Sequence, residues 1–110
     1  MGTVYVIQEV PGRNILSAEK YGTLKPLLSA GTQVVLSSQP TITKLKKSLQ
    51  DFNSDDYLLL MGDPAIIGIA CSIASDINQG KFKVLKWDNQ EKRYYSVEID
   101  IHNKGGLDGW

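Results

Sequence analysis

The strongest constraint on the fold is a strand, a helix and a second strand that follow one another in the second half of the chain. The continuous apolar run Tyr57–Met61 is short and has acidic and turn residues on either side, which favours a strand buried on both faces. Asp63 and Pro64 are a typical N-cap and first helical residue, so a helix is predicted from Pro64 to about Gln79. A strand over Lys81–Trp87 follows, and this order predicts that the two strands are parallel.

A second unit of the same kind precedes the first. Thr32–Ser38 is a β-branched run after Gly31 and predicts another strand. From Pro40 onward the apolar residues follow a helical period, on a stripe made of Ile42, Leu45, Leu49 and Phe52. The two units together predict a core of three parallel strands with right-handed crossovers.

Further strands are predicted at both ends of the chain. Thr3–Val10 reads as a strand that ends at Pro11, and Arg93–Ile101 alternates polar and apolar side chains. The second of these would form a β-hairpin with Lys81–Trp87, and both would extend the parallel core. Residues 13–31 remain unassigned, because Asn14–Tyr21 fits either a strand or a short helix.

These elements make up one predicted domain over residues 1–101. We expect the α/β class: a mixed, mostly parallel sheet of about five strands, with two main helices and a C-terminal β-hairpin. Residues 102–110 contain three of the glycines and are predicted to be a flexible tail.

Composition excludes several classes of protein. The single Cys excludes an intrachain disulfide and a Cys-rich zinc site, and a formal net charge of +0 gives no overall attraction to nucleic acid or to an anionic membrane. No apolar stretch approaches the ~20 residues of a membrane span, and no signal peptide is visible. We therefore expect a cytoplasmic protein with no cofactor, no metal and no membrane partner.

Catalysis finds little support in the sequence. Cys71 lies among apolar residues in the middle of the second predicted helix, which indicates a buried small side chain and not a reactive thiolate. His102 adjoins the Gly-rich tail, a poor place to hold a general base rigidly. No catalytic residue is predicted, although a site assembled from distant segments would leave no local pattern.

An anion-binding site is one candidate, at the turns where the two predicted helices begin. Ligands of parallel α/β sheets gather at the carboxyl ends of the strands, close to helix N-termini. The candidate residues are Ser38, Gln39, Gly62 and Asp63. The alternative is that Ser38 and Asp63 only cap their helices, and the Asp63 carboxylate would itself repel phosphate.

A nucleic-acid surface on the hairpin is a second candidate. Basic and aromatic residues alternate there, a combination used to bind single strands; they are Lys81, Lys83, Lys86, Trp87, Lys92, Arg93 and Tyr94. The alternative is an amphipathic hairpin whose lysines protect a sheet edge from aggregation.

A protein partner is the third possibility, and a homo-oligomer is a variant of it. Gly68 and Ser72 form a small-residue patch on the second predicted helix that would allow close packing, either on the protein's own sheet or on a second copy. The hairpin edge and the strand–helix turns would form the main surface of such a binding module.

Several segments together resemble one group of proteins: Asp56–Pro64, Ile67–Ala70, Phe82–Asp88, and Arg93–Asp100. They are similar to small uncharacterised proteins encoded by tailed bacteriophages, notably phages of marine bacteria, over residues 3–101. The group has no assigned activity, so the resemblance carries over no catalytic residue. It implies an accessory protein made in an infected bacterial cell. We therefore expect a non-catalytic module that binds an unknown protein in the host cytoplasm, with nucleic-acid binding or a nucleotide-binding enzyme as alternatives.

Overall fold

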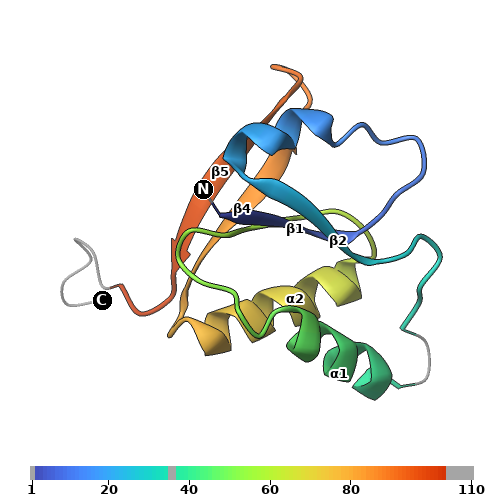
Figure 1. Cartoon of the computed structure of the whole chain (residues 1–110), viewed down its shortest axis with the longest axis vertical. Coiled ribbons are helices and arrows are strands. Elements are labelled where there is room, and N and C mark those ends of the chain that lie inside the picture. Colours follow the sequence, from blue (N-terminus) through green and yellow to red (C-terminus); the bar gives the residue numbers. More distant parts are fainter. Residues whose placement is uncertain (1, 35–36, 104–110) are drawn as a thin grey trace.

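The computed structural model describes residues 2–34 and 37–103, which form one five-stranded sheet with helices on both faces (Figure 1). The strand order is β2-β1-β3-β4-β5. The strands are β1 (Thr3–Gln8), β2 (Thr23–Leu28), β3 (Tyr57–Leu59), β4 (Lys81–Asp88) and β5 (Arg93–Asp100). The helices are the 3-10 helix η1 (Leu16–Tyr21) and the α-helices α1 (Gln39–Ser48) and α2 (Pro64–Ile77).

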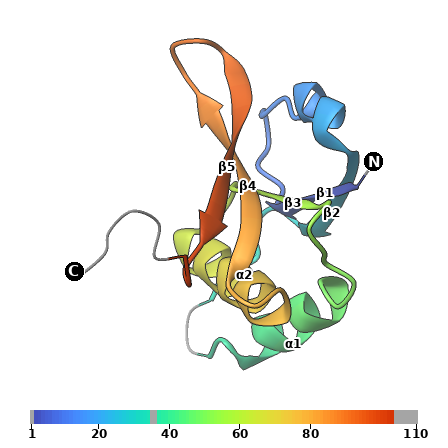
Figure 2. The ribbon, with the colours of Figure 1, turned by 90° about the vertical axis from the view of Figure 1, so that its left-hand side faces the viewer.

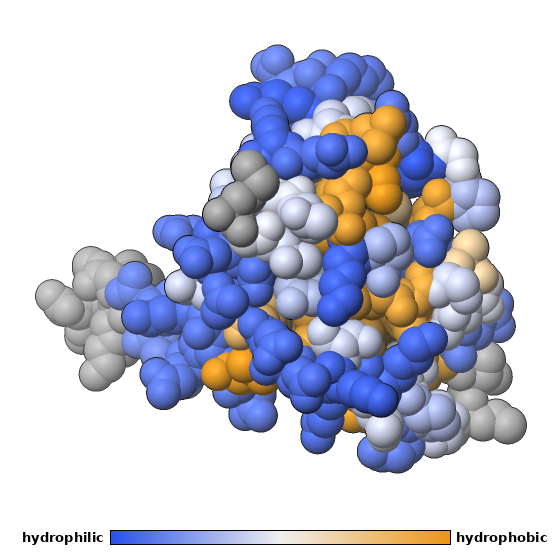
Figure 3. All heavy atoms as spheres, in the orientation of Figure 1, coloured by the Kyte–Doolittle hydropathy of each residue, from blue (hydrophilic) through white to orange (hydrophobic). Residues whose placement is uncertain are grey.

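The first four strands in the sheet order are parallel, and only β5 runs antiparallel to its neighbour. The short strand β3 pairs with β4 only over Lys83–Leu85. Lys86–Asp88 of β4 and Arg93–Tyr95 of β5 therefore continue past β3, with the turn between them, as a projecting hairpin (Figure 2). Hydrophilic residues cover the tip of this hairpin and the outer side of α1 (Figure 3).

The core has two parts, one on each face of the sheet. On one face α1 and α2 lie side by side and bury residues such as Leu45, Leu49 and Ile66 against Tyr5 and Ile7. On the other face, η1 is the one described helix that covers the sheet, with Ala18 against a small cluster that includes Val4, Val6, Leu85 and Tyr94. This second face leaves the hairpin largely uncovered.

The fold class predicted from the sequence is confirmed, together with the hairpin and the start of α2. Asp63 caps α2, because its Oδ1 accepts a hydrogen bond from the Ala65 N–H at 2.8 Å. The helix ends close to the predicted point, since Gln79 and Gly80 both have positive φ and the Gly80 N–H donates to the Ser75 carbonyl.

The predicted strand over 32–38 is wrong for the residues that the structure describes there. Thr32–Val34 and Ser37 have no regular structure, and Val35 and Leu36 lie outside the described residues. The strand in this part of the chain is β2, which contains Pro26. Proline is tolerated because β2 is an edge strand and does not need every backbone donor.

The position of β1 also differs from the prediction. The sequence placed the N-terminal strand outside a three-strand parallel core, whereas β1 lies between β2 and β3. Its residues Val4 to Gln8 are buried, which fits a central strand covered on both faces. The predicted flexible tail lies, from residue 104 onward, outside the described residues. Among the described residues no helix is long and apolar enough to cross a membrane.

Candidate binding site

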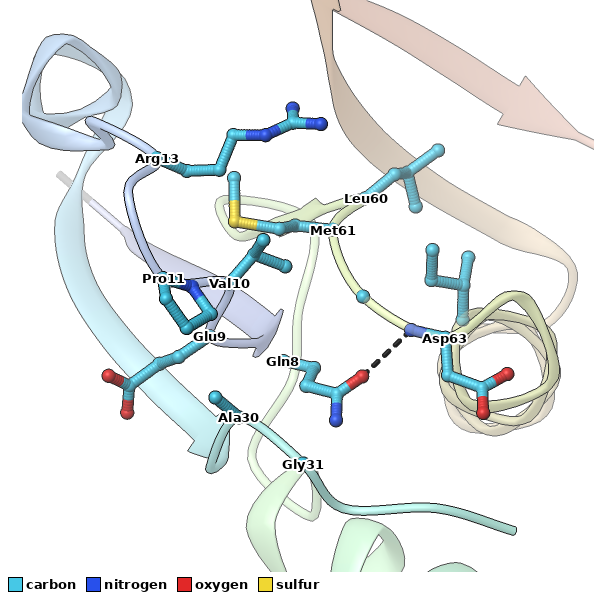
Figure 4. Close-up of a pocket in the computed structure, with 12 residues that line it drawn as sticks. Gln8, Glu9, Val10, Pro11, Arg13, Ala30, Gly31, Leu60, Met61 and Asp63 are labelled. Carbon is cyan, nitrogen blue, oxygen red and sulfur yellow. Dashed lines mark hydrogen bonds between the residues drawn. The ribbon is translucent and has the colours of Figure 1, made fainter. Parts of the chain in front are cut away.

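The strand order creates a topological switch point between β1 and β3. The connection from β1 to β2 carries η1 on one face, and the connection from β2 to β3 carries α1 on the other. In open α/β sheets ligands bind at the carboxyl ends of the strands beside such a point. A hollow of about 470 Å³ lies there, which we call the switch-point pocket; its lining includes Gln8, Glu9, Arg13, Met61, Gly62 and Asp63 (Figure 4).

The buried Gln8 side chain closes the floor of the switch-point pocket. Its Oε1 accepts a hydrogen bond from the Asp63 N–H at 2.7 Å, the contact drawn in Figure 4. Its Nε2 donates to the carbonyls of Ser29 at 3.2 Å and Thr32 at 2.9 Å. One amide group thus ties together the loops that follow β2 and β3, and its capacity for hydrogen bonds is used within the protein.

Gly62 is required by this arrangement. Its φ of +117° is a backbone conformation that residues with a side chain rarely adopt, and a Cβ there would lie 2.4 Å from the Gln8 Cβ. The turn before α2 is therefore packed directly on Gln8, with no room for a ligand between them.

At the predicted anion site, the backbone nitrogens of Asp63, Pro64 and Ala65 offer no free donor to an anion. The Asp63 N–H is held by Gln8, Pro64 has no N–H, and the Ala65 N–H is bonded to the Asp63 carboxylate. Ser38 and Gln39, the other predicted residues, begin α1 and do not line the switch-point pocket. Ser38 and Gln39 therefore do not form one site with Gly62 and Asp63. At α2 the geometry agrees with the interpretation that Asp63 caps the helix.

Arg13, a residue that the sequence did not single out, lies at the rim of the same pocket. The preceding turn fits type II, with Pro11 in the second position, Gly12 at φ +82° in the third, and the Arg13 N–H donating to the Val10 carbonyl at 3.2 Å. The side chain extends from this loop toward Met61 (Figure 4). Within the described residues the Arg13 guanidinium forms no ion pair and no hydrogen bond.

Arg13 also lines a second hollow, of about 420 Å³, which we call the Arg13–Trp87 cleft. Its lining residues come from the loop after β1 and from the projecting hairpin; they are Gly12, Arg13, Asn14, Trp87, Asn89 and Tyr94. Trp87 is 39% exposed, which is unusual for so large an apolar side chain. A guanidinium without a partner in the described part of the chain and an exposed indole thus line one small concave surface.

The walls of the Arg13–Trp87 cleft are held in place by contacts behind them. The Trp87 and Tyr94 rings meet edge to face, with their centroids 5.0 Å apart. The Tyr94 hydroxyl donates to the Asn14 carbonyl at 3.4 Å, and the Tyr21 hydroxyl donates to the Tyr94 carbonyl at 3.2 Å. Burial raises the pKa of the Tyr94 phenol, while the nearby Arg13 guanidinium acts in the opposite direction.

The residues predicted to bind nucleic acid are divided between the faces and ends of the hairpin. Lys83 lies over the Tyr57 ring at 4.2 Å on the η1 face, whereas Lys86 lies over the Tyr95 ring at 5.8 Å on the other. Lys81 begins β4, so it is roughly 20 Å from Trp87 along the strand.

The remaining members of the predicted nucleic-acid set lie at the hairpin turn or at the start of β5. Lys92 donates to the Asn89 side chain at 3.0 Å, and Arg93 pairs with Asp88 in the strand register. Tyr94 is buried, at 4% exposure, and offers no face for stacking on a base. Of the whole set, Trp87 and Tyr94 line the Arg13–Trp87 cleft, and the cations do not form a continuous track.

Neither Cys71 nor His102, the two side chains considered for catalysis, lines the switch-point pocket. Burial raises the pKa of the Cys71 thiol on α2, which disfavours the thiolate. His102 follows β5, and β5 runs antiparallel, so His102 lies at the opposite end of the sheet from the switch-point pocket. Among the described residues no group of three or more His, Cys, Asp or Glu side chains could hold a metal ion.

Arg13 escaped the sequence analysis because it lies in the stretch that carried no decisive pattern. The available signal was the Pro11-Gly12 pair, which marks a turn and so a fixed position for the residue that follows. Nothing in the sequence indicates that this turn meets Trp87, because the two are brought together only by the order of the strands.

Comparison with known proteins now gives the family. The sequence model of the family described as Phage Pam3 gp32-like protein matches residues 2–101, so the chain belongs to that family of phage proteins. The resemblance to phage proteins is thereby confirmed, while the link to marine bacteria stays a prediction. No curated protein and no solved structure matches the chain.

Proposed function

We propose that the protein is a non-catalytic accessory module that binds another protein in the cytoplasm of the infected bacterium. The proposal is carried by one observation: the Arg13 guanidinium, which has no ion-pair or hydrogen-bond partner within residues 2–34 and 37–103, lines the same hollow as the exposed Trp87 ring. Trp, Tyr and Arg are the side chains that dominate the energy of protein interfaces, particularly where they lie in a preformed concave surface.

The chemistry of the Arg13–Trp87 cleft favours a particular kind of partner. A free guanidinium binds a carboxylate through two parallel hydrogen bonds, and an indole face packs against an apolar or aromatic side chain. We therefore infer that the partner presents an Asp or Glu next to an apolar residue. The projecting hairpin would bring this surface clear of the rest of the molecule.

Nucleic acid is the less favoured ligand for the same surface. Binding to a single strand needs cations that follow a backbone, and the hairpin cations lie on opposite faces. The neutral overall charge also provides no long-range attraction.

The test is capture from a lysate of the host bacterium with the full chain as bait, with and without nuclease, at low and high salt. Trp87→Ala is compared with Leu16→Ala, which removes another exposed apolar side chain, one that lies on η1 outside the lining of the Arg13–Trp87 cleft. We expect a stoichiometric protein that survives nuclease and salt, is retained by Leu16→Ala and is lost by Trp87→Ala. Recovery of nucleic acid alone, or equal capture by both variants, would overturn the proposal.

A further inference from the structure

The two edges of the sheet differ in how well they are protected against pairing with another strand. The edge strand β2 has six residues, and Pro26 in its middle removes a backbone donor. The other edge strand, β5, has eight residues and no proline. Within the described part of the chain β4 is the only strand paired with β5, and the Tyr21 hydroxyl donates to the Tyr94 carbonyl, so the outer edge of β5 is available from Tyr95 onward.

The charges along β5 are arranged with opposite signs at its two ends. Lys92 and Arg93 stand at the beginning of the strand, and Glu98 and Asp100 stand near its end. A second copy of β5 laid alongside in the antiparallel direction therefore brings the basic end of each strand next to the acidic end of the other. A parallel arrangement would oppose like charges.

The side chains of β5 on the face of α1 and α2 continue the apolar core to this edge. Tyr95, Val97 and Ile99 are half-buried, and the last two pack against the main core. These three side chains lie next to the unpaired backbone edge of β5. A second β5 strand bound there would cover apolar surface and would also complete its backbone hydrogen bonds.

We propose that the protein forms a homodimer in which two β5 strands pair antiparallel across a two-fold axis, joining the two sheets into one. With Ser96 on the axis, Tyr95 lies opposite Val97 of the second copy and Lys92 lies opposite Asp100 of the second copy. Each contact occurs twice, as the symmetry of a closed dimer requires. This inference does not rest on the Arg13–Trp87 cleft, because Tyr94 is the one residue of β5 in the lining of the cleft and the proposed contacts are made by the residues on either side of it.

The proposal is tested by light scattering of the full chain after size-exclusion chromatography over a wide range of protein concentration. We expect a concentration-dependent dimer. Ser96 is exposed, so Ser96→Lys leaves the fold intact and sets two cations against each other on the axis. We expect this substitution to raise the dissociation constant roughly fivefold, whereas Thr23→Lys, at an exposed position on the β2 edge, leaves it unchanged.

A charge exchange separates this interface from any other. Lys92→Glu and Asp100→Lys should each weaken the dimer about tenfold, since each creates two pairs of like charges, and the double variant should restore it. A monomer at all concentrations overturns the proposal. So does a dimer that is insensitive to these changes and is disrupted by Gly68→Arg, a position on α2 with open space around it.

Discussion

The two hollows at the carboxyl end of the sheet share Arg13 but differ in what their polar groups are doing. In the switch-point pocket, the Gln8 amide bonds the Asp63 N–H and two loop carbonyls, and the Asp63 carboxylate bonds the Ala65 N–H. In the Arg13–Trp87 cleft, the guanidinium has no partner among the described residues and the indole is exposed.

Under the proposed function, the bonded groups of the first hollow support the fold and the groups of the second are the ones proposed to bind. Parallel sheets place helix N-termini and strand ends at one edge, so this edge is the general location of ligand sites. In this protein the polar groups of the switch-point pocket hold the loops after β2 and β3 together. The half formed with the hairpin keeps the groups that can contact another molecule. The comparison predicts losses of stability on the first side and losses of binding on the second.

The largest loss of stability is expected from Gly62→Ala. The new Cβ would meet the Gln8 side chain in a backbone conformation that alanine disfavours, so we expect a cost of about 2–4 kcal/mol in the free energy of unfolding. Gly12→Ala is the matched control, because its φ is also positive but nothing lies within 4 Å; a cost of about 1 kcal/mol is expected. Urea unfolding measures both, and equal costs would contradict the closed packing of Gly62.

A smaller loss is expected from Gln8→Ala. The substitution leaves the Asp63 N–H and the carbonyls of Ser29 and Thr32 without their partner, and we expect a cost of roughly 2 kcal/mol. Gln50→Ala, at an exposed position after α1, should change the free energy of unfolding by less than about 0.5 kcal/mol. If the two glutamine variants had the same midpoint of urea unfolding, the hydrogen bonds of Gln8 to the loops after β2 and β3 would not stabilise the fold.

Asp63→Ala should have an intermediate effect, because it removes only the cap of α2. We expect a cost of about 1 kcal/mol, and Asp63→Asn should recover most of it, since asparagine also caps helices. Thermal unfolding monitored by circular dichroism distinguishes the two. A stability gain in Asp63→Ala would show that the carboxylate is retained for some purpose other than capping.

The smallest effect on stability is expected from Arg13→Gln. The guanidinium makes no bond in the described structure, so the free energy of unfolding should change by less than about 0.5 kcal/mol. The same chemical denaturation series provides the measurement. A cost above about 1 kcal/mol would mean that Arg13 supports the fold and would weaken the distinction between the two hollows.

The sequence predicted those parts of the fold that depend on local signals. Asp63 and Pro64 marked the start of α2, and the alternation over Arg93–Ile101 predicted the strand that is β5. It failed where tertiary position overrides local preference. Pro26 obscured β2, which tolerates proline as an edge strand, and the β-branched run after Gly31 misplaced the strand of this region.

The candidate site was predicted only in part. Gly62 and Asp63 were placed at the carboxyl end of the strands, where the switch-point pocket lies, and Trp87 was included among the candidate nucleic-acid-binding residues of the hairpin. Arg13 was missed, and the difference between the two hollows could not be predicted from the sequence. That distinction depends on whether Gln8, far away in the sequence, accepts a bond from the Asp63 N–H. Contacts between distant segments leave no local pattern for sequence analysis to detect.

The most direct test of the account reverses the charge of Arg13. The full-length Arg13→Glu variant and a control, Lys47→Glu on the exposed side of α1, are compared for capture of the protein partner from the host lysate and for urea unfolding. The account predicts that Arg13→Glu loses the partner while its free energy of unfolding stays within about 0.5 kcal/mol of the parent, and that the control keeps both. Undiminished capture by Arg13→Glu would contradict the claim that the Arg13–Trp87 cleft is the binding surface.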